Sequence, residues 1–139
     1  MVITVFDASA VLRFLLGEAG GVRVKELLAT AQSGQAAALI SAVNWGEVVG
    51  KIDKSQGRAA ADALTSTMQF YGLRIIPAGA ERAAKAALIK LDWKLGYADA
   101  FCVELTASLP KSILITADHD FQLVTGLVTV EFLPNKPTP

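Results

Sequence analysis

Short apolar runs alternate along the chain with longer segments in which apolar residues recur at helical spacing. The short runs predict strands, because a strand buried on both faces of a parallel sheet is a nearly continuous hydrophobic stretch. The longer segments predict helices with one buried face. The predicted strands are Val2–Phe6, Ala36–Ile40, Leu73–Ile76, Ile113–Thr116 and Leu127–Phe132. The predicted helices are Asp7–Leu16, Val22–Ala31, Val43–Asp53 (with Ser41 as its cap), Gln56–Phe70, Ala80–Leu91 and Ala98–Ser108, with one more short helix before the last strand.

Each connection between two predicted strands passes through helical sequence, which is typical of right-handed crossovers and a mostly parallel sheet. The chain is 53% hydrophobic, which is high and favours helices on both faces of that sheet. We therefore predict an α/β fold with one domain, residues 1–133. A proline-rich tail, residues 134–139, is expected to be loose, because it cannot continue a helix or a central strand.

The composition disfavours several classes of protein. No apolar stretch reaches the ~18–20 residues of a membrane span. The first residues, MVITVFDAS, have no basic segment before the apolar run, so they indicate a strand and not a signal peptide. A single cysteine, Cys102, allows no intramolecular disulfide, which fits a cytoplasmic location. Because the chain has one histidine, His119, it offers too few ligands for a zinc site and no evident catalytic triad.

Thirteen basic and thirteen acidic residues cancel to a formal net charge of zero. Nucleic acid is therefore not bound by bulk charge, and such binding would need a metal ion and a local basic patch. A small cluster, Lys51, Lys54 and Arg58, and also Arg13, could contact a phosphate backbone, although solvated surface charges are the simpler interpretation. High apolar content without net charge also indicates a surface that another copy or a partner covers.

Asp7 and Asp118 each follow an apolar run that is predicted to be a strand. Either one alone could simply cap a helix, since aspartate accepts hydrogen bonds from backbone N–H groups at a helix start. Two of them after separate strands of one parallel sheet lie at the same edge, which is where such sheets bind ligands. The pair therefore favours a site.

Two further acids lie in predicted helices. Asp99 shares a face with Cys102 in a helix that is apolar nearly all round, so it is expected to be largely buried; a helix cap or a pair with Lys94 would be the simpler explanation. Glu47 points away from the apolar stripe of its helix and could instead form an exposed pair with Lys51.

If the fold gathers these four acids, they form a dense cluster of carboxylates. Two carboxylates about 5 Å apart repel by roughly 3 kcal/mol at an effective dielectric constant near 20, so the cluster needs a compensating cation. Ligands that are all oxygen favour Mg²⁺ or Mn²⁺ over zinc. Asn44, close to Glu47 in sequence, is a further polar group for this cleft, and Asp120 is expected to be solvated or in an outer shell.

Four segments of the chain carry a resemblance to a known family. They are Val5–Val11 (VFDASAV), Ser41–Val48 (SAVNWGEV), Leu95–Ala100 (LGYADA) and Ile115–Phe121 (ITADHDF). In their residues, order and separations they resemble PIN-domain ribonucleases, specifically the VapC-type toxins of bacterial and archaeal toxin–antitoxin pairs. The resemblance covers the chain up to the proline-rich tail. It departs from the family's pattern in that tail and at Arg13, and neither departure touches the acids.

The resemblance implies a three-layer α/β/α PIN-like fold and a metal-dependent endoribonuclease, the toxin of a type II toxin–antitoxin module, that cleaves RNA with a water activated by the metal. It implies that Mg²⁺ or Mn²⁺ is held by Asp7, Glu47, Asp99 and Asp118, supported by the hydroxyls of Ser9 and Thr116. Asp7 and Asp99 would be the primary ligands. The expected partners are an RNA substrate, a separate antitoxin chain that covers the site and a second copy in a homodimer, with no membrane.

Other classes fit less well. A phosphatase with an aspartyl nucleophile usually has a second aspartate two residues after the first, where this chain has Ser9. A phosphorylation-receiver domain needs a lysine near the last strands, and Ala117 and Asp118 follow the strand there instead. A dinucleotide-binding domain needs GxGxxG after its first strand, and the chain has none there. The remaining alternative is a catalytically silent PIN fold that binds RNA or a partner, which the presence of all four acids argues against.

Overall fold

The computed structural model describes residues 1–135, and the part of the predicted tail beyond Asn135 lies outside the described residues. The strands are β1 (Val2–Phe6), β2 (Ala36–Ser41), β3 (Leu73–Ile76), β4 (Ser112–Thr116) and β5 (Val130–Phe132). The helices are α1 (Ala8–Leu15), α2 (Gly21–Gln32), α3 (Ala42–Gln56), α4 (Arg58–Phe70), α5 (Ala80–Trp93) and α6 (Tyr97–Ala107), with a 3₁₀ helix, η1 (His119–Val124). Every predicted strand and helix is present.

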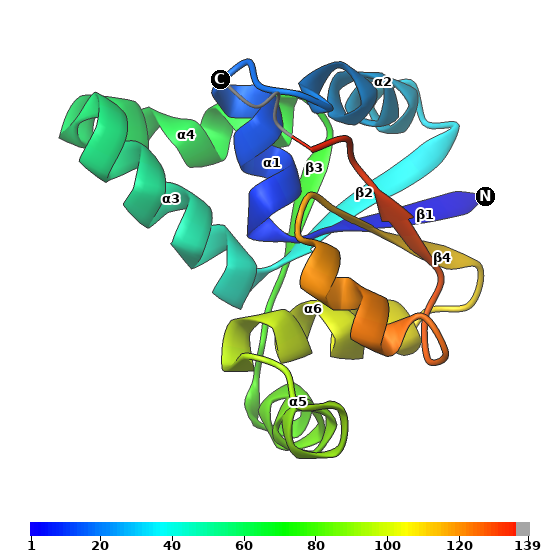
Figure 1. Ribbon diagram of the computed structural model, residues 1–139. Helices are drawn as coiled ribbons and strands as arrows, with labels where there is room; N and C mark the ends of the chain where they lie inside the picture. Colours follow the sequence, from blue (N-terminus) through cyan, green and yellow to red (C-terminus); the bar gives the residue numbers. More distant parts are fainter. Residues whose placement is uncertain (136–139) are drawn as a thin grey trace.

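The five strands form one sheet in the order β3-β2-β1-β4-β5, and every neighbouring pair is parallel (Figure 1). The strand β1 lies at the centre, with Phe6 in register with Ile40 of β2 on one side and Ile115 of β4 on the other. The prediction of a mostly parallel sheet is confirmed. Because β1 and β4 are neighbours, the residues that follow them meet at the carboxyl edge of the sheet.

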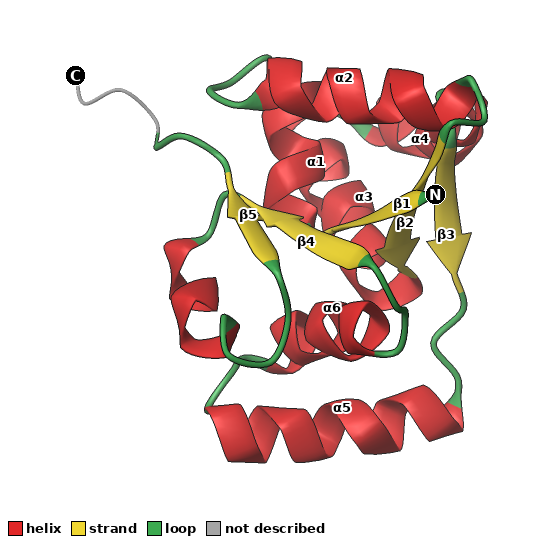
Figure 2. Cartoon of the chain, turned by 90° about the vertical axis from the view of Figure 1, so that its right-hand side faces the viewer, coloured by secondary structure: helices red, strands yellow, loops and turns green. Residues whose placement is uncertain are grey.

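Helices cover both faces of the sheet, in three layers (Figure 2). Helices α1 to α4 pack on the face to which Phe6 and Ile40 point, and α6 and η1 pack on the face to which Val5 and Leu39 point. This alternation follows from the strand period of two. Helix α5 lies outside α6 and does not cover the sheet directly (Figure 2). Among the described residues, no helix has both the length and the apolar character that crossing a membrane requires.

The prediction of a strand over Leu127–Phe132 is wrong in its first half, since β5 begins at Val130. The N–H groups of Leu127 and Val128 both donate to the carbonyl of Val124, at 2.9 and 3.1 Å. This segment therefore completes the turn that ends η1. A short apolar run does not distinguish a strand from a buried turn.

The boundary between α3 and α4 also differs from the prediction. Gln56 is the last residue of α3, and α4 begins at Arg58. Gly57 separates them with φ of +95°, a conformation that side chains other than glycine rarely adopt. The predicted cap of α3 is confirmed, because Ser41 Oγ accepts a hydrogen bond from the Val43 N–H at 3.3 Å.

Candidate functional site

Asp7 lies directly after β1 and is only 3% exposed. Its carboxylate accepts hydrogen bonds from Thr116 Oγ1 at 2.6 Å, from Ser9 Oγ at 2.8 Å and from the Ala10 N–H at 2.9 Å. The bond to Ala10 makes Asp7 the cap of α1. Capping and membership of a site are therefore compatible here, because the same carboxylate also lines a cavity.

The hydroxyls of Ser9 and Thr116 connect the turn after β1 to the turn after β4. Ser9 Oγ accepts from the Ala117 N–H at 2.9 Å and lies 3.3 Å from Thr116 Oγ1, which accepts from the Asp118 N–H, also at 2.9 Å. This network makes two strand ends one rigid unit. Asp118 itself is half-buried and caps η1 through the Asp120 N–H, at 2.9 Å.

Asp99 lies in the first turn of α6 and is half-buried. The residues that follow it, Ala100–Thr106, are all buried, so the prediction of a buried helix is confirmed. Within residues 1–135, Asp99 forms no ion pair with Lys94, and the cap of α6 is Gly96. Neither of the simpler explanations of Asp99 therefore applies.

Glu47 is exposed on α3 and is linked to α6 through Asn44. Asn44 Nδ2 donates to Glu47 Oε1 at 3.3 Å and to the carbonyl of Ala98 at 3.0 Å. Glu47 forms no ion pair with Lys51 in the described part of the chain. Asn44 is 1% exposed, and its Oδ1 is a buried polar atom without a hydrogen-bond partner among the described residues. Glu47 is thus directed to the site by a buried side chain.

The four acids that the sequence singled out come together at one cavity of about 210 Å³, lined by Asp7, Glu47, Asp99 and Asp118. We call it the carboxylate cavity; Ser9 and Lys51 also line it. Among the described residues, no three acidic, histidine or cysteine side chains stand close enough to form a complete set of metal ligands. The charges of Asp118, Asp7 and Glu47 nevertheless act on the Asp99 carboxylate in this cavity.

The charges in this cavity are poorly compensated. Burial raises the pKa of Asp7 to about 6, although the hydrogen bonds from Thr116, Ala10 and Ser9 lower it and the charge of Asp118 raises it further. Burial, followed by the charges of Asp118, Asp7 and Glu47, raises the pKa of Asp99 to about 6 as well. Unbalanced negative charge and donors that are all oxygen fit a hard divalent cation such as Mg²⁺ or Mn²⁺.

The predicted basic cluster is divided by the structure. Lys51 lines the carboxylate cavity, whereas Lys54 and Arg58 do not, and Arg58 pairs with Asp53. Arg13 is 8% exposed, and its Nη1 donates to the carbonyls of Ala19 and Pro134, both at 2.7 Å. Arg13 therefore also joins α1 to the segment that follows β5.

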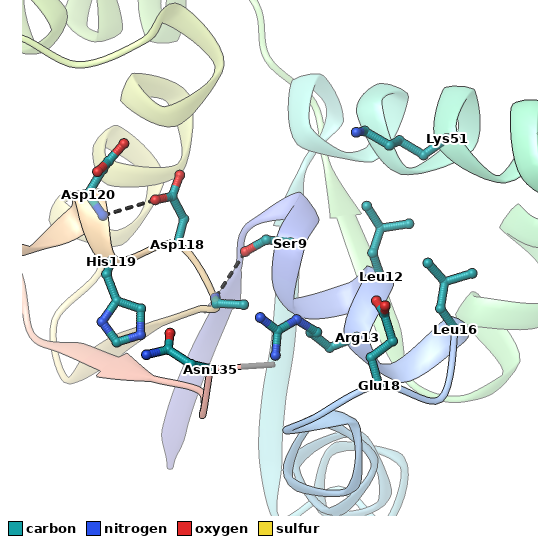
Figure 3. Close-up of a pocket in the computed structure, with 11 residues that line it drawn as sticks. Ser9, Leu12, Arg13, Leu16, Glu18, Lys51, Asp118, His119, Asp120 and Asn135 are labelled. Atoms are coloured by element: carbon teal, nitrogen blue, oxygen red, sulfur yellow. Dashed lines mark hydrogen bonds between the residues drawn. The ribbon is translucent and has the colours of Figure 1, made fainter. Parts of the chain in front are cut away.

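A second and larger cavity, of about 740 Å³, adjoins the first (Figure 3). We call it the flanking cavity; its walls include Ser9, Arg13, Lys51, Asp118, His119 and Asn135. No sequence pattern pointed to Asn135, because only the return of the chain after β5 brings this residue to the cavity. His119 stacks on Phe132 with ring centroids 5.0 Å apart.

Comparison with known proteins places this geometry in a family. The family model described as the PIN domain matches residues 4–127. No curated protein matches the chain.

Three solved structures have a similar fold, and two of them are described as a toxin or as a toxin–antitoxin complex. The structure of VapBC2 from Rickettsia felis, bound to a DNA fragment from its promoter, has a TM-score of 0.71 and 15% identity, covering 96% of this chain and all of that one. VapC20 from Mycobacterium tuberculosis, described as a toxin that cleaves the sarcin–ricin loop, has a TM-score of 0.70 and 20% identity, covering 92% and 98%. A toxin–antitoxin complex from Klebsiella pneumoniae has a TM-score of 0.65 and 23% identity, covering 91% and 96%.

At these identities the structures show a shared fold. The family match extends over most of the chain and includes the segments that carry Asp7, Glu47, Asp99 and Asp118. The chain belongs to the PIN-domain family.

Proposed function

We propose that the protein is a metal-dependent endoribonuclease and the toxin of a type II toxin–antitoxin pair. One observation carries the nuclease: Asp7, Glu47, Asp99 and Asp118, from four different parts of the chain, line a single cavity at the carboxyl edge of the sheet. Membership of the PIN-domain family supports it, and so do the toxin–antitoxin names of the structures with the same fold.

The donors of the carboxylate cavity fit Mg²⁺ or Mn²⁺. A divalent cation, when bound, lowers the pKa of a coordinated water and neutralises the charge that develops on the phosphate and the leaving oxygen. Asp7 and Asp99 are the proposed primary ligands, and both have a pKa raised to about 6, so each carboxylate gains from a neighbouring cation.

The surrounding residues give these ligands different freedom. Asp7 is held by the hydroxyls of Ser9 and Thr116, so its free lone pairs have a fixed direction. Glu47 reaches the cavity from an exposed position on α3, and its carboxylate accepts a hydrogen bond from Asn44 Nδ2. In our proposal Glu47 and Asp118 complete the set of ligands or accept the proton of the attacking water.

The RNA backbone is proposed to pass over Lys51, since this side chain lines both cavities beside the acids. Lys54 and Arg58 are outer contacts in this proposal, and the pairing of Arg58 with Asp53 weakens its role. Arg13 contributes to the wall of the flanking cavity.

The proposed protein partners are an antitoxin, as a separate chain, and a second copy of this chain. Large apolar side chains are exposed on several elements; among them Phe70, at the end of α4, is 73% exposed, and Leu88 and Leu91, on α5, are 63% and 70% exposed. Since α5 lies outside α6, its outer face is available for a second copy (Figure 2). The double substitution Leu88→Ser with Leu91→Ser is expected to convert a dimer to a monomer in light scattering, and an unchanged dimer would refute this location.

The function is tested by incubating total cellular RNA with the purified, antitoxin-free protein. Mn²⁺, Mg²⁺ and EDTA are compared, and the Asp99→Asn variant is treated in parallel. We expect discrete fragments that disappear with EDTA and in the variant. Their ends would identify the RNA that is cut.

A folded protein that cleaves no RNA with any divalent ion would refute the nuclease and favour a PIN fold that binds RNA or a partner. A metal titration then separates the cases, since a module without catalysis does not need the acids to bind Mn²⁺. Full metal-dependent activity in Asp99→Asn would refute the assignment of the site.

A further inference from the structure

The flanking cavity is positioned to receive the part of a substrate that adjoins the reacting phosphate. It shares Ser9, Leu12, Lys51 and Asp118 with the carboxylate cavity, so the two volumes meet along a common wall. Its volume of about 740 Å³ lies within the ~300–1,000 Å³ typical of ligand pockets. A chain that places one phosphate at the acids has this space directly beside it.

His119 presents a preordered aromatic ring in this cavity. The imidazole stacks on Phe132 of β5, with centroids 5.0 Å apart and an angle of 28° between the planes. Although His119 is exposed, this contact restrains its ring. One face of the ring lies against Phe132, and His119 also lines the cavity. Stacking of a base on an aromatic side chain is largely independent of the base, because every base has a π face.

Asn135 adds a side-chain amide to the same cavity, and a buried arginine fixes its position. Arg13 Nη1 donates to the carbonyl of Pro134, the residue directly before Asn135, and to Ala19. Both hydrogen bonds are made by Nη1, one of the three guanidinium nitrogens. In the described part of the chain, Arg13 forms no ion pair with a carboxylate. Figure 3 shows the Arg13 guanidinium, the Asn135 amide and the His119 ring all at the cavity. An amide offers both donors and an acceptor to the edge of a base.

Net charge does not make this cavity a phosphate site. Among the described residues that line it, Arg13 and Lys51 stand together with three acids, Glu18, Asp118 and Asp120. The groups that distinguish the flanking cavity are instead a restrained ring and a neutral amide. Both are suited to a planar, uncharged and polar-edged ligand such as a nucleobase.

We infer that the flanking cavity is a base subsite of the proposed nuclease, in which His119 stacks on the base next to the scissile phosphate and Asn135 faces its edge. This inference rests on the proposed function. Because a base inside a duplex has both faces covered by its stacked neighbours, the substrate is unpaired at this nucleotide.

The test measures binding of fluorescein-labelled twelve-nucleotide oligoadenylate by anisotropy, with Mn²⁺. All proteins carry Asp99→Asn, so that the probe stays intact. A second probe has the same backbone with abasic central nucleotides. The variants are His119→Ala, His119→Phe and His119→Lys. Gln122→Ala is the matched control, because Gln122 is exposed in the same 3₁₀ helix but does not line the cavity.

We expect His119→Ala to weaken binding of oligoadenylate roughly tenfold, the scale of one base–aromatic stack. His119→Phe should remain within about threefold of the histidine protein, His119→Lys should resemble His119→Ala, and Gln122→Ala should bind normally. On the abasic probe all variants should bind alike.

Three results would overturn the base subsite. They are no measurable binding of oligoadenylate, an equal loss on the abasic probe in His119→Ala, and normal binding by His119→Lys with loss in His119→Phe. The last result would mean that charge, and not stacking, is the contribution of His119.

Cleavage assays keep the two proposals apart. If the protein without Asp99→Asn cleaves cellular RNA and His119→Ala leaves KM unchanged, the subsite fails and the nuclease stands. If no RNA is cleaved but His119→Ala still loses base-dependent binding, the nuclease fails and the base site stands.

Discussion

The carboxylates that follow strands and those carried by helices are held in different ways. Asp7 is 3% exposed and accepts hydrogen bonds from two hydroxyls and a backbone N–H. Asp118, after β4, belongs to the same network through its own backbone N–H. In contrast, Glu47 on α3 is exposed and has one side-chain contact, with Asn44, and no hydrogen bond to the Asp99 carboxylate is formed within residues 1–135.

One site therefore combines carboxylates in fixed positions after the strands with carboxylates on the helices that are held by fewer hydrogen bonds. Because β1 and β4 are paired neighbours, the residues at their carboxyl ends have fixed positions relative to each other. Hydroxyls after one strand can therefore donate to a carboxylate after the other. On the helices, Glu47 has a longer side chain with one hydrogen bond, and no hydrogen bond from the described residues holds the Asp99 carboxylate. We therefore expect substitutions on the strand side to disturb both geometry and charge, and those on the helix side to act mainly through charge.

The largest effect is expected when a primary ligand loses its charge. Asp7→Asn and Asp99→Asn should each reduce RNA cleavage by more than about 100-fold, because even outer partners of metal ligands typically contribute 10- to 100-fold. Asp99→Asn should not lower the free energy of unfolding, since burial and neighbouring charges already disfavour the carboxylate. Cleavage rates and chemical unfolding in EDTA measure both effects. A large loss of stability in Asp99→Asn would contradict the expectation that acids on the helices act mainly through their charge.

The next effect concerns the hydroxyl that orients Asp7. Thr116→Val keeps the shape of the side chain but removes the 2.6 Å hydrogen bond to Asp7 and an acceptor for the Asp118 N–H. Cleavage should fall about 10- to 100-fold, as for other groups that orient metal ligands. Thr106→Val is the matched control, because the Thr106 hydroxyl is also buried but bonds only within α6, to Cys102. Equal activity of the two variants would refute an orienting role for Thr116.

The dependence of stability on pH should reflect the raised pKa values. Asp7 and Asp99 each have a pKa of about 6 in the folded protein, above the ordinary aspartate value of 3.8, so the folded state binds more protons between these two pH values. Stability in EDTA should therefore rise as the pH falls from 7 to 5, by about 1 kcal/mol for Asp7 and less for the half-exposed Asp99.

Urea unfolding of the protein and of Asp99→Asn at pH 7, 6 and 5 measures this rise. The variant should show a smaller increase than the parent. If both proteins lost stability equally as the pH fell, the charged forms of Asp7 and Asp99 would not be the groups that destabilise the fold.

The smallest effect distinguishes the basic residues. Lys51→Ala should raise KM for RNA a few-fold, because Lys51 lines both cavities, and the effect should shrink at high salt. Lys54→Ala removes a similar exposed charge that lines neither cavity and should stay within about twofold. Equal effects of the two substitutions would show that only the general charge of α3 matters.

Much of the fold follows from local sequence. Apolar runs and helical periodicity predicted every strand and helix, because a buried parallel strand and a helix with one apolar face have distinct patterns. The errors came where local patterns are ambiguous. Leu127 and Val128 are as apolar as strand residues but close a turn, and Gly57 divides two helices through a backbone angle that composition alone does not reveal.

The four acids could also be selected from the sequence. Asp7 and Asp118 follow predicted strands, Asp99 lies in a helix that is apolar nearly all round, and Glu47 lies in a segment that resembles the PIN-domain family. Only the tertiary structure decided how each is held: the order of β1 and β4 places Thr116 against Asp7, and Asn44 reaches from α3 to α6. Long-range packing also separated Lys51 from Lys54 and brought Asn135 beside Arg13. Residue patterns indicate which side chains are buried and which segments form strands or helices. A site depends instead on contacts between residues far apart in the chain, and the order of the strands and the packing of the helices determine these contacts.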